Sequence, residues 1–545
     1  MTWVYHPPTP DIHDLCMLAG HNQNQAVRIT PTPRRRPTVL QPKSLMHPSL
    51  RKPFHAIAAA LGIFAAGLLL GLPARAPADA FDLPEMGSSA DSVMSVAEQR
   101  ELGREFMKWV RKALKVSSDP VLTDYIQALG NQLAAAGREG AGNYDFFIID
   151  DPSINAFAGP AGHIGINAGL IMAAETESEL AAVVAHELAH VSQKHLMRAF
   201  EVQKQMSIPT VALMLAAAVL GAAVDPSAGI AAMASVQGLA AQKQINFTRA
   251  NEEEADRIGI DTLARAGHDP FAMPGFFQKL TRATRIYESG APELLRTHPV
   301  TTDRIADGLS RAEGYGHQQQ PDSLRFHLTR ADLRQRKYSR PEQAVDHFED
   351  TLEKGRYRNE TAERYGYALA LNRAGRLGDA AAQLRPLLQR HPSQMEFIVL
   401  SADILLRSGR PELAVKELKG PVGLSPGNWP LRQAYAEALM ANGQPADALS
   451  SLEGFVALRP GIPQIYSLMS DAAGKSGQKA QTLRWRAEAL YYNGDLEPAV
   501  RQLELALRQP KLDFYLASKI QVRLSEMRAE ERKQDKKERK RGSND

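Results

Sequence analysis

The stretch Thr176-Glu-Ser-Glu-Leu-Ala-Ala-Val-Val-Ala-His-Glu-Leu-Ala-His190 sets the interpretation of the first half of the chain. Thr176, followed three residues later by Glu179, forms a capping box, the usual signal for the start of a helix. Apolar residues then recur at helical spacing on one face, at Leu180, Val183, Val184, Leu188 and Val191. The stretch therefore predicts a helix with a long apolar face.

Three residues of this helix can carry chemistry. His186 and His190 stand at positions i and i+4, so both imidazoles lie on one face and can hold one zinc ion. Glu187 lies about 100° around the helix, so its carboxylate can reach a water on the metal without ligating the metal. The alternative, two ordinary surface histidines, fits poorly because the helix is apolar around them. The spacing indicates a zinc site in which Glu187 is the base.

Composition limits what else the chain can be. It has 545 residues, 44% of them hydrophobic and 23% charged, which is typical of two or more globular domains. A net charge of +4, spread over residues of both signs, gives no indication of nucleic-acid binding. The single cysteine, Cys16, excludes an intramolecular disulfide and a thiolate zinc site. Any metal site must therefore be built from His, Asp and Glu.

A catalytic zinc needs a third protein ligand. The best candidates lie in the segment Asn251–Arg257, which opens another helical pattern and carries Glu252 and Asp256 on one face. One of these carboxylates can bind the metal while the other accepts a ring N–H from a ligand histidine. The alternative is a set of carboxylates that merely favours a helix N-terminus.

The beginning of the chain has the order of an export signal. Residues 1–45 show no apolar periodicity and are expected to be an unstructured upstream extension. Residues 46–80 contain a basic start, an uncharged run over 56–72 and then small residues, which is typical of a secretory signal peptide. An uncleaved N-terminal anchor is the alternative.

A first domain is expected over residues 81–315, mostly helical with a small β-sheet. Two helical patterns cover residues 96–136, and strands are expected at 144–149 and 162–167, with a loop between them. We expect substrate to lie extended along Ile164, Gly165, Ile166 and Asn167, pairing with this strand at an edge of the sheet.

The second half of the chain is repetitive. Glycines stand 34 residues apart, and prolines keep the same period half a repeat away: Gly375, Gly409, Gly443 and Gly477, with Pro392, Pro426 and Pro460. This is the tetratricopeptide pattern, which predicts an α-solenoid of helix pairs over residues 325–510. Residues 511–545 are a charged tail, interpreted as a solvated helix, with an interaction arm as the alternative.

Residues 206–242 form an apolar stretch whose only charged residue is Asp225. Lys204 and Lys243 lie on either side of this stretch. Its two arms are short and rich in Ala, so two membrane spans are not expected. We interpret it as a helical hairpin that is buried or covers a groove. Contact with a membrane surface or a membrane-bound partner is the alternative.

Five segments resemble a known family, the gluzincin metallopeptidases that include HtpX and the CAAX prenyl proteases. They are Asp82–Gly87, Ile154–Ala158, His186–His190, Asn251–Gly259 and Thr297–Pro299. The match is closer to the periplasmic branch, the β-barrel assembly-enhancing proteases, which add tetratricopeptide repeats to this domain. One departure is Ala161-Gly162, where a Gly-Gly turn is common in the family; we expect it to alter a loop only.

The resemblance implies one zinc ion per chain, held by His186, His190 and Glu252, with Glu187 as the catalytic base and Asp256 behind a ligand. His298 is a candidate for stabilising the oxyanion, or for a fourth ligand that closes the resting site. Its alternative is a turn histidine bonded to backbone.

The resemblance further implies a periplasmic protease that acts on misassembled or stalled outer-membrane proteins. Its repeats would contact those substrates or the β-barrel assembly machinery. The rival hypothesis is a periplasmic chaperone or adaptor that acts through its repeats and whose protease activity is latent. An integral-membrane peptidase would need several long spans that are not found in the sequence.

Overall fold

The computed structural model describes residues 94–138, 140, 142–200, 238–286, 292–318, 320–459 and 461–542. The expected upstream extension and signal peptide lie outside these residues. Of the apolar stretch 206–242, the structure describes only residues 238–242, in the first turns of a long helix. Among the helices that the structure describes, none is both long and apolar enough to cross a membrane.

Two helices precede the sheet, as the sequence predicts. Helix α2 spans Val96–Ala113 and is capped by Ser95, whose hydroxyl accepts a hydrogen bond from Glu98 N. Helix α3 spans Pro120–Ala136 and is capped by Asp119. The apolar residues of α2 that the sequence places on one face, among them Leu102, are buried. Both helices therefore form because a capped start is followed by an apolar stripe that finds a core.

The sheet has three strands: β1 (Asp145–Ile149), β2 (Ala156–Ala158) and β3 (His163–Asn167). The order is β1-β3-β2, with β1 parallel and β2 antiparallel to β3. The sequence predicts β1 and β3 correctly but misses β2, because three residues are too short to show an alternating pattern. The expected loop between the two strands therefore contains a third strand.

The expectation that residues 164–167 form an edge strand is wrong. β3 is the middle strand, paired with β1 over its whole length and with β2 over Ile164–Ile166. Its backbone hydrogen-bonding groups are used on both sides there, so no substrate strand can be added to it. At the two ends of the β2–β3 ladder, Asn167 N donates to Asn155 O and Gly159 N donates to His163 O. In an antiparallel pair, alternate residues of a strand face the partner, so the backbone groups of Ala156 and Ala158 face away from β3.

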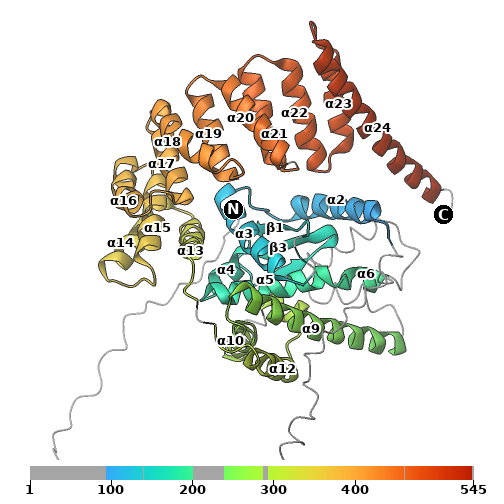
Figure 1. Cartoon of the computed structure of the whole chain (residues 1–545), viewed down its shortest axis with the longest axis vertical. Helices are drawn as coiled ribbons and strands as arrows, with labels where there is room; N and C mark the ends of the chain where they lie inside the picture. Colours follow the sequence, from blue (N-terminus) through green and yellow to red (C-terminus); the bar gives the residue numbers. More distant parts are fainter. Residues whose placement is uncertain are drawn as a thin grey trace, which may run out of the picture. The chain divides into compact units, whose positions relative to one another are not determined.

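The remaining helices of the first domain lie around α5 (Glu177–Ser192), whose residues from Glu177 to Ala189 are buried except Glu179. These helices are α4 (Ala168–Ala173), α6 (His195–Phe200), α9 (Gly238–Ala266), α10 (Ala272–Ile286), α11 (Glu293–Thr297) and α12 (Thr302–Glu313), with a short 3-10 turn at Pro160–Gly162. Helix α5 packs against α3, α9 and α10 (Figure 1). Its burial explains the apolar face that the sequence shows.

The start of α5 matches its prediction in part. Thr176 caps the helix by accepting a hydrogen bond from Glu179 N at 3.2 Å. The Glu179 carboxylate accepts from Glu175 N, one residue before the cap, rather than from Thr176 N. The reciprocal half of the predicted capping box is therefore shifted by one residue.

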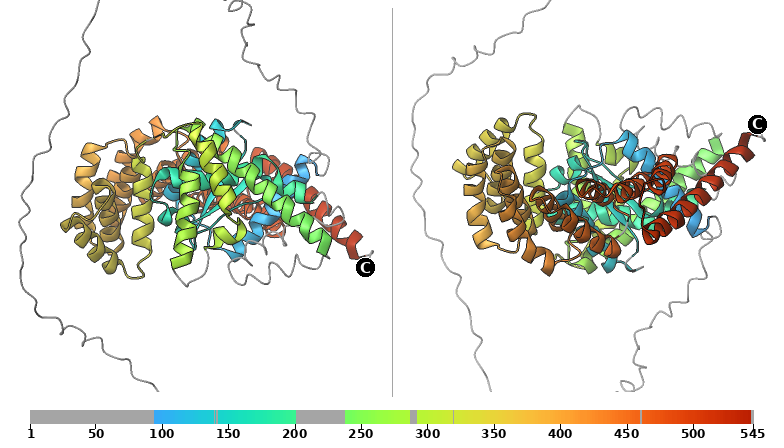
Figure 2. Two further views of the ribbon diagram at one scale, coloured as in Figure 1. Left: turned by 90° about the horizontal axis from the view of Figure 1, so that it is seen from below. Right: turned by 90° about the horizontal axis from the view of Figure 1, so that it is seen from above.

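From residue 324 onward the chain is a row of helices, visible in Figures 1 and 2. They are α13 (Leu324–Arg336), α14 (Pro341–Glu353), α15 (Glu360–Arg373), α16 (Leu377–Arg390), α17 (Met395–Arg407), α18 (Pro411–Leu424), α19 (Trp429–Ala441), α20 (Pro445–Leu458), α21 (Pro463–Lys475), α22 (Lys479–Tyr492), α23 (Leu496–Leu507) and α24 (Phe514–Gly542). The four periodic glycines stand at the turns between paired helices, with φ between +70° and +78°. Glycine adopts this left-handed backbone without strain, which explains the period.

The predicted charged tail begins with a helix that packs on the solenoid. Ile520, Leu524 and Met527 of α24 are buried in a cluster with residues of α23. Phe514 and Tyr515, at the start of the same helix, are exposed. The first turns of α24 therefore belong to the packed helical stack.

Charged side chains join α13 to the first domain. Arg325 donates to Asp124 of α3 at 2.9 Å and to Glu396 of α17 at 2.7 Å. Glu177, at the start of α5, accepts hydrogen bonds from Tyr125 and Ser323. The helix that begins the solenoid is thus hydrogen-bonded to the domain that contains α5.

Candidate metal centre

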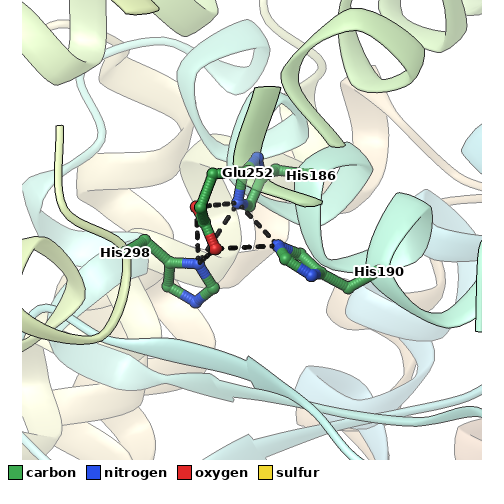
Figure 3. A group of neighbouring side chains, drawn as sticks. All are labelled: His186, His190, Glu252 and His298. Atoms are coloured by element: carbon green, nitrogen blue, oxygen red, sulfur yellow. Dashed lines mark hydrogen bonds and ion pairs between the residues drawn. The ribbon is translucent and has the colours of Figure 1, made fainter. Parts of the chain in front are cut away.

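Residues that lie far apart in the sequence meet beside α5 (Figure 3). Helix α5 supplies His186 and His190, α9 supplies Glu252, and His298 follows directly after α11. In the part of the chain that the structure describes, these four residues form the one group of metal-ligating side chains whose ligand atoms all lie within 4.8 Å of one another.

The ligand atoms are closely spaced. His186 Nε2 lies 3.1 Å from His190 Nε2 and 3.3 Å from His298 Nδ1. Glu252 Oε1 lies 3.4 Å from His190 Nε2 and 3.0 Å from His298 Nδ1. Four potential donors thus lie within 4.8 Å of one another.

The spacing and the chemistry of these donors fit zinc. Two donors that each lie about 2.1 Å from a zinc ion at a tetrahedral angle are about 3.4 Å apart. The separations of 3.0–3.4 Å are close to this value. Three imidazoles and one carboxylate, with no thiolate, are borderline ligands that suit zinc better than calcium or magnesium.

Glu187 lies next to this cluster. Its side chain is fully buried, and within the described residues neither carboxylate oxygen has a hydrogen-bond partner. His298 Nε2 approaches Oε1 to 3.3 Å, which is within ion-pair distance. A buried carboxylate without hydrogen bonds is costly to the fold, and such groups concentrate at functional sites.

Asp256 and Arg304 lie directly behind the cluster. Asp256 Oδ1 is 3.0 Å from His186 Nδ1, on the side of the ring opposite to the other potential ligands. Arg304 donates to both oxygens of Asp256, from Nε at 2.7 Å and from Nη2 at 2.9 Å. Its Nη1 donates to Pro299 O and lies 3.1 Å from Glu252 Oε2. One buried guanidinium therefore holds Glu252 and Asp256 in place.

Arg304 was missed in the sequence. The signal that could have found it is its place on α12, where Arg304, Gly308 and Ala312 share one buried face. An arginine on the buried face of a helix needs a carboxylate partner, and the pair Glu252 and Asp256 needs a cation.

The pKa values at the site reflect this arrangement. Burial lowers the pKa of His186, but hydrogen bonds to Asp256 and Glu252 outweigh burial and raise it to about 10. Burial raises the pKa of Glu252, and the positive charges of His298 and His186 outweigh it, so the pKa lies well below its ordinary value. Burial and the charge of His186 hold the pKa of His190 well below its ordinary value, so His190 is neutral.

His195, which the sequence did not single out, lies against His190, and Glu254 lies on the far side of His195. His195 Nδ1 is 2.9 Å from His190 Nδ1, and His195 Nε2 is 3.1 Å from Glu254 Oε2. Burial raises the pKa of Glu254, but the hydrogen bond from His195 and the charge of Arg198 lower it overall. A third histidine five residues after His190, beyond the end of the helix, is the sequence signal that was available.

The remaining predicted site residues lie in β3. The structure gives Asn167 a different contact from the one expected: its amide donates to Ser153 Oγ at 2.8 Å. The backbone of Ile164, Gly165 and Ile166 is paired on both sides, as described above. Within the described residues the edge of the sheet next to α5 belongs to β2 instead, since β2 pairs there with one strand and packs against α5.

Comparison with known proteins agrees with this site. The model of peptidase family M48 matches residues 120–312, and a tetratricopeptide repeat model matches residues 405–472. The β-barrel assembly-enhancing protease of Escherichia coli K12 is 37% identical over 355 residues, which cover 65% of this chain and 72% of that protein. The protein of the same name from Yersinia pestis is 35% identical over 337 residues, covering 62% and 69%.

Two more distant similarities are to a mitochondrial metalloendopeptidase and to a tetratricopeptide protein. The mitochondrial metalloendopeptidase OMA1 of Danio rerio is 28% identical over 233 residues, covering 41% of this chain and 48% of that protein. A solved tetratricopeptide protein of Thermus thermophilus is 20% identical and covers 36% of this chain and 95% of its own, with a TM-score of 0.25.

The match to the Escherichia coli protein covers more than two thirds of that protein at 37% identity, and this chain also matches the peptidase and tetratricopeptide models. The chain therefore belongs to the family of β-barrel assembly-enhancing proteases, metalloendopeptidases of peptidase family M48 that carry tetratricopeptide repeats.

Proposed function

We propose that this chain is a zinc-dependent endopeptidase of the periplasm that degrades misassembled or stalled outer-membrane proteins. The observation that carries the catalytic part is the grouping of His186, His190 and Glu252 beside the buried carboxylate of Glu187. Three protein ligands and a neighbouring general base are what a catalytic zinc site requires.

When zinc is bound, it polarises the scissile carbonyl and lowers the pKa of a water at the site. Glu187 takes a proton from the attacking water and then passes it to the leaving amine. Among the described residues neither oxygen of Glu187 accepts a hydrogen bond, and His298 Nε2, 3.3 Å from Oε1, pairs with this carboxylate by charge. The Asp256 carboxylate pairs with His186 Nδ1 at 3.0 Å and keeps the other ring nitrogen directed to the ligand cluster.

In this proposal His298 is a fourth ligand of the resting site rather than the oxyanion donor. Its Nδ1 lies 3.0 Å from Glu252 Oε1 and 3.3 Å from His186 Nε2, at the same spacing as the other ligand atoms. A tetrahedral zinc with four protein ligands has no open position for substrate. Hydrolysis then requires that His298 move away first.

The substrate class rests on the relatives, which are named β-barrel assembly-enhancing proteases. Tetratricopeptide solenoids present extended binding surfaces, so the repeats are suited to recruit such a protein or its assembly partner. An extended substrate segment would pair with the free edge of β2, where the backbone groups of Ala156 and Ala158 face away from β3. Backbone pairing reads the main chain and gives loose sequence specificity.

The closed ligand set also favours a second candidate, a chaperone or adaptor whose protease activity is latent. Four ligands leave hydrolysis conditional on a trigger, while the solenoid is available in every state. The two functions differ in whether the carboxylate of Glu187 matters.

The full chain and its Glu187→Gln variant separate them. Both should contain about one zinc ion per chain, because Glu187 is not one of the four clustered ligands. If the proposal holds, only the wild type removes a stalled β-barrel protein from the periplasm of cells that lack the native protease. Equal rescue by the variant would support the adaptor and contradict the protease.

A further inference from the structure

The second ring nitrogen of each ligand histidine in α5 has a different kind of partner. His186 Nδ1 faces the carboxylate of Asp256 directly. His190 Nδ1 faces another imidazole, that of His195, at 2.9 Å, with the two rings edge to face at 82°. His195 is 4% exposed, and the proposed reaction gives it no role.

A strained turn brings His195 to this position. Helix α5 ends at Ser192, and α6 begins at His195. Between them Lys194 has φ +54°, a left-handed backbone that is rare for residues other than glycine, asparagine and aspartate. This turn redirects the chain so that the ring of His195 folds back against His190. Strain of this kind persists where the surrounding structure requires it.

The far side of His195 is anchored by charge. Its Nε2 lies 3.1 Å from Glu254 Oε2, and Arg198 Nη2 donates to the same oxygen at 3.2 Å. Arg198 is itself fixed by two hydrogen bonds to Gln193 O. The guanidinium keeps the carboxylate ionised, so Glu254 can only accept a hydrogen bond.

The ionised carboxylate of Glu254 determines which ring nitrogens of His195 and His190 carry a proton. Because Glu254 accepts, the proton of neutral His195 lies on Nε2, and its Nδ1 carries a lone pair. That lone pair accepts the Nδ1 proton of His190 across 2.9 Å. The lone pair of His190 is then on Nε2, the atom that lies 3.1 Å from His186 Nε2 and 3.4 Å from Glu252 Oε1.

We propose that His195 is a positioning residue that fixes the tautomer and ring orientation of His190, so that Nε2 of His190 is presented to the metal. The inference rests on the proposed zinc site. Such outer partners of ligand histidines typically change metal affinity 10–100-fold when they are lost.

The use of an imidazole here has an electrostatic reason. Glu252, Asp256 and Glu187 already place three carboxylates at a site that is almost completely buried. A fourth carboxylate against His190 would add another buried negative charge, which is costly. His195 transmits the hydrogen bond and leaves the charge on Glu254, whose side chain is 29% exposed while that of His195 is 4% exposed. His190 is oriented without a further buried charge.

The test compares zinc dissociation constants of full-length variants, measured by competition with a chromophoric chelator. His195→Leu keeps the volume and removes both hydrogen bonds, and we expect it to weaken zinc binding by about 10–100-fold. His195→Gln retains one acceptor and one donor, and we expect it to recover most of that loss. His347→Leu, a histidine of α14 in the solenoid, is the control and should bind zinc as the wild type does.

A purely structural role for His195 would give a different order of zinc affinities among these variants. Leucine fills an apolar site at least as well as glutamine, so His195→Leu would then be the more stable variant and would bind zinc no more weakly. The positioning role is overturned if His195→Leu binds zinc like the wild type, or if glutamine recovers nothing. A wild type that binds no zinc would instead overturn the site itself.

Discussion

Arg304 and Asp256 form a two-point ion pair behind the ligand cluster, with Nε–Oδ2 at 2.7 Å and Nη2–Oδ1 at 2.9 Å. Both side chains are buried, at 4% and 6% exposure. The pair joins α12 to α9, and through Asp256 it reaches His186. The geometry of the site therefore depends on a helix that supplies none of the four clustered ligands.

Removing this guanidinium should be strongly destabilising. Arg304→Met leaves Asp256 and Glu252 buried without their cation, and breaking a buried ion pair in this way costs about 3–5 kcal/mol. We expect a loss of that size in the free energy of unfolding, measured in urea on the metal-free full chain. The same variant should also bind zinc more weakly, because Asp256 loses its orientation.

Arg311→Met is the matched control, since Arg311 lies on the same helix and pairs with Asp307 at the surface. Exposed pairs contribute roughly 0–1 kcal/mol. If the two variants lost similar stability, the Arg304 pair would not be the structural support described here.

His298→Ala should increase peptidase activity. If His298 occupies the fourth position of a resting zinc site, its removal opens that position to substrate while His186, His190 and Glu252 still hold the metal. A rise of about tenfold in casein cleavage would correspond to a competing ligand worth roughly 1.4 kcal/mol. Zinc content should stay near one per chain. A loss of activity with zinc retained would instead assign His298 to oxyanion stabilisation.

Glu293 should give the protein a pH-dependent stability. This residue of α11 is 8% exposed, and its carboxyl accepts a hydrogen bond from Ser153 Oγ. Burial raises its pKa above the ordinary value of 4.5. The folded protein therefore binds the proton more tightly than the unfolded chain, so this residue lowers stability as pH rises from about 4.5 through the folded pKa.

Glu293→Gln removes this titration and nearly keeps the shape. Relative to the variant, the wild type should lose stability as pH rises above about 4.5 and through the raised pKa of Glu293, measured from unfolding curves of both proteins at each pH. Both proteins carry the same other carboxylates, so the contributions of these groups cancel when the stability difference between wild type and variant is compared at two pH values. A difference that does not change with pH would show that Glu293 is solvated in the folded protein.

Two glycines of one repeat should respond in opposite directions to alanine. Apart from its chain neighbours and its own helix, a side chain at Gly443 or at Gly454 would meet no atom within 4 Å. Gly443 has φ +74°, so Gly443→Ala should cost about 1–2 kcal/mol. Gly454 lies inside α20, so Gly454→Ala should add about 0.5–1 kcal/mol. The midpoints of urea unfolding of the two variants and the wild type measure these changes. Equal shifts in both variants would contradict the left-handed backbone at the turn glycine.

Several parts of this structure were predictable from local sequence signals. The spacing of His186, Glu187 and His190 is a property of one helix, as is the pairing of Glu252 with Asp256 on α9. The solenoid was predictable because each repeat restates the same turn glycine. Helical spacing fixes which residues share a face, whatever the remainder of the fold does.

The parts that were missed depend on tertiary structure. The order β1-β3-β2 puts the predicted edge strand in the middle, because strand order is decided by pairing between segments and not by their composition. Arg304 reaches Asp256 from 48 residues away. His195 contacts His190 because Lys194 adopts a left-handed backbone. A lysine in the sequence does not indicate this conformation.

X-ray absorption at the zinc edge, on the wild type and on His298→Ala, shows directly which kinds of side chain hold the metal. We expect about one zinc per wild-type chain, with four nitrogen or oxygen ligands at about 2.0–2.1 Å, of which three are imidazoles. In His298→Ala one imidazole should be replaced by a water. Absence of zinc, or a wild-type site with fewer than two imidazoles, would contradict the assignment of His186 and His190.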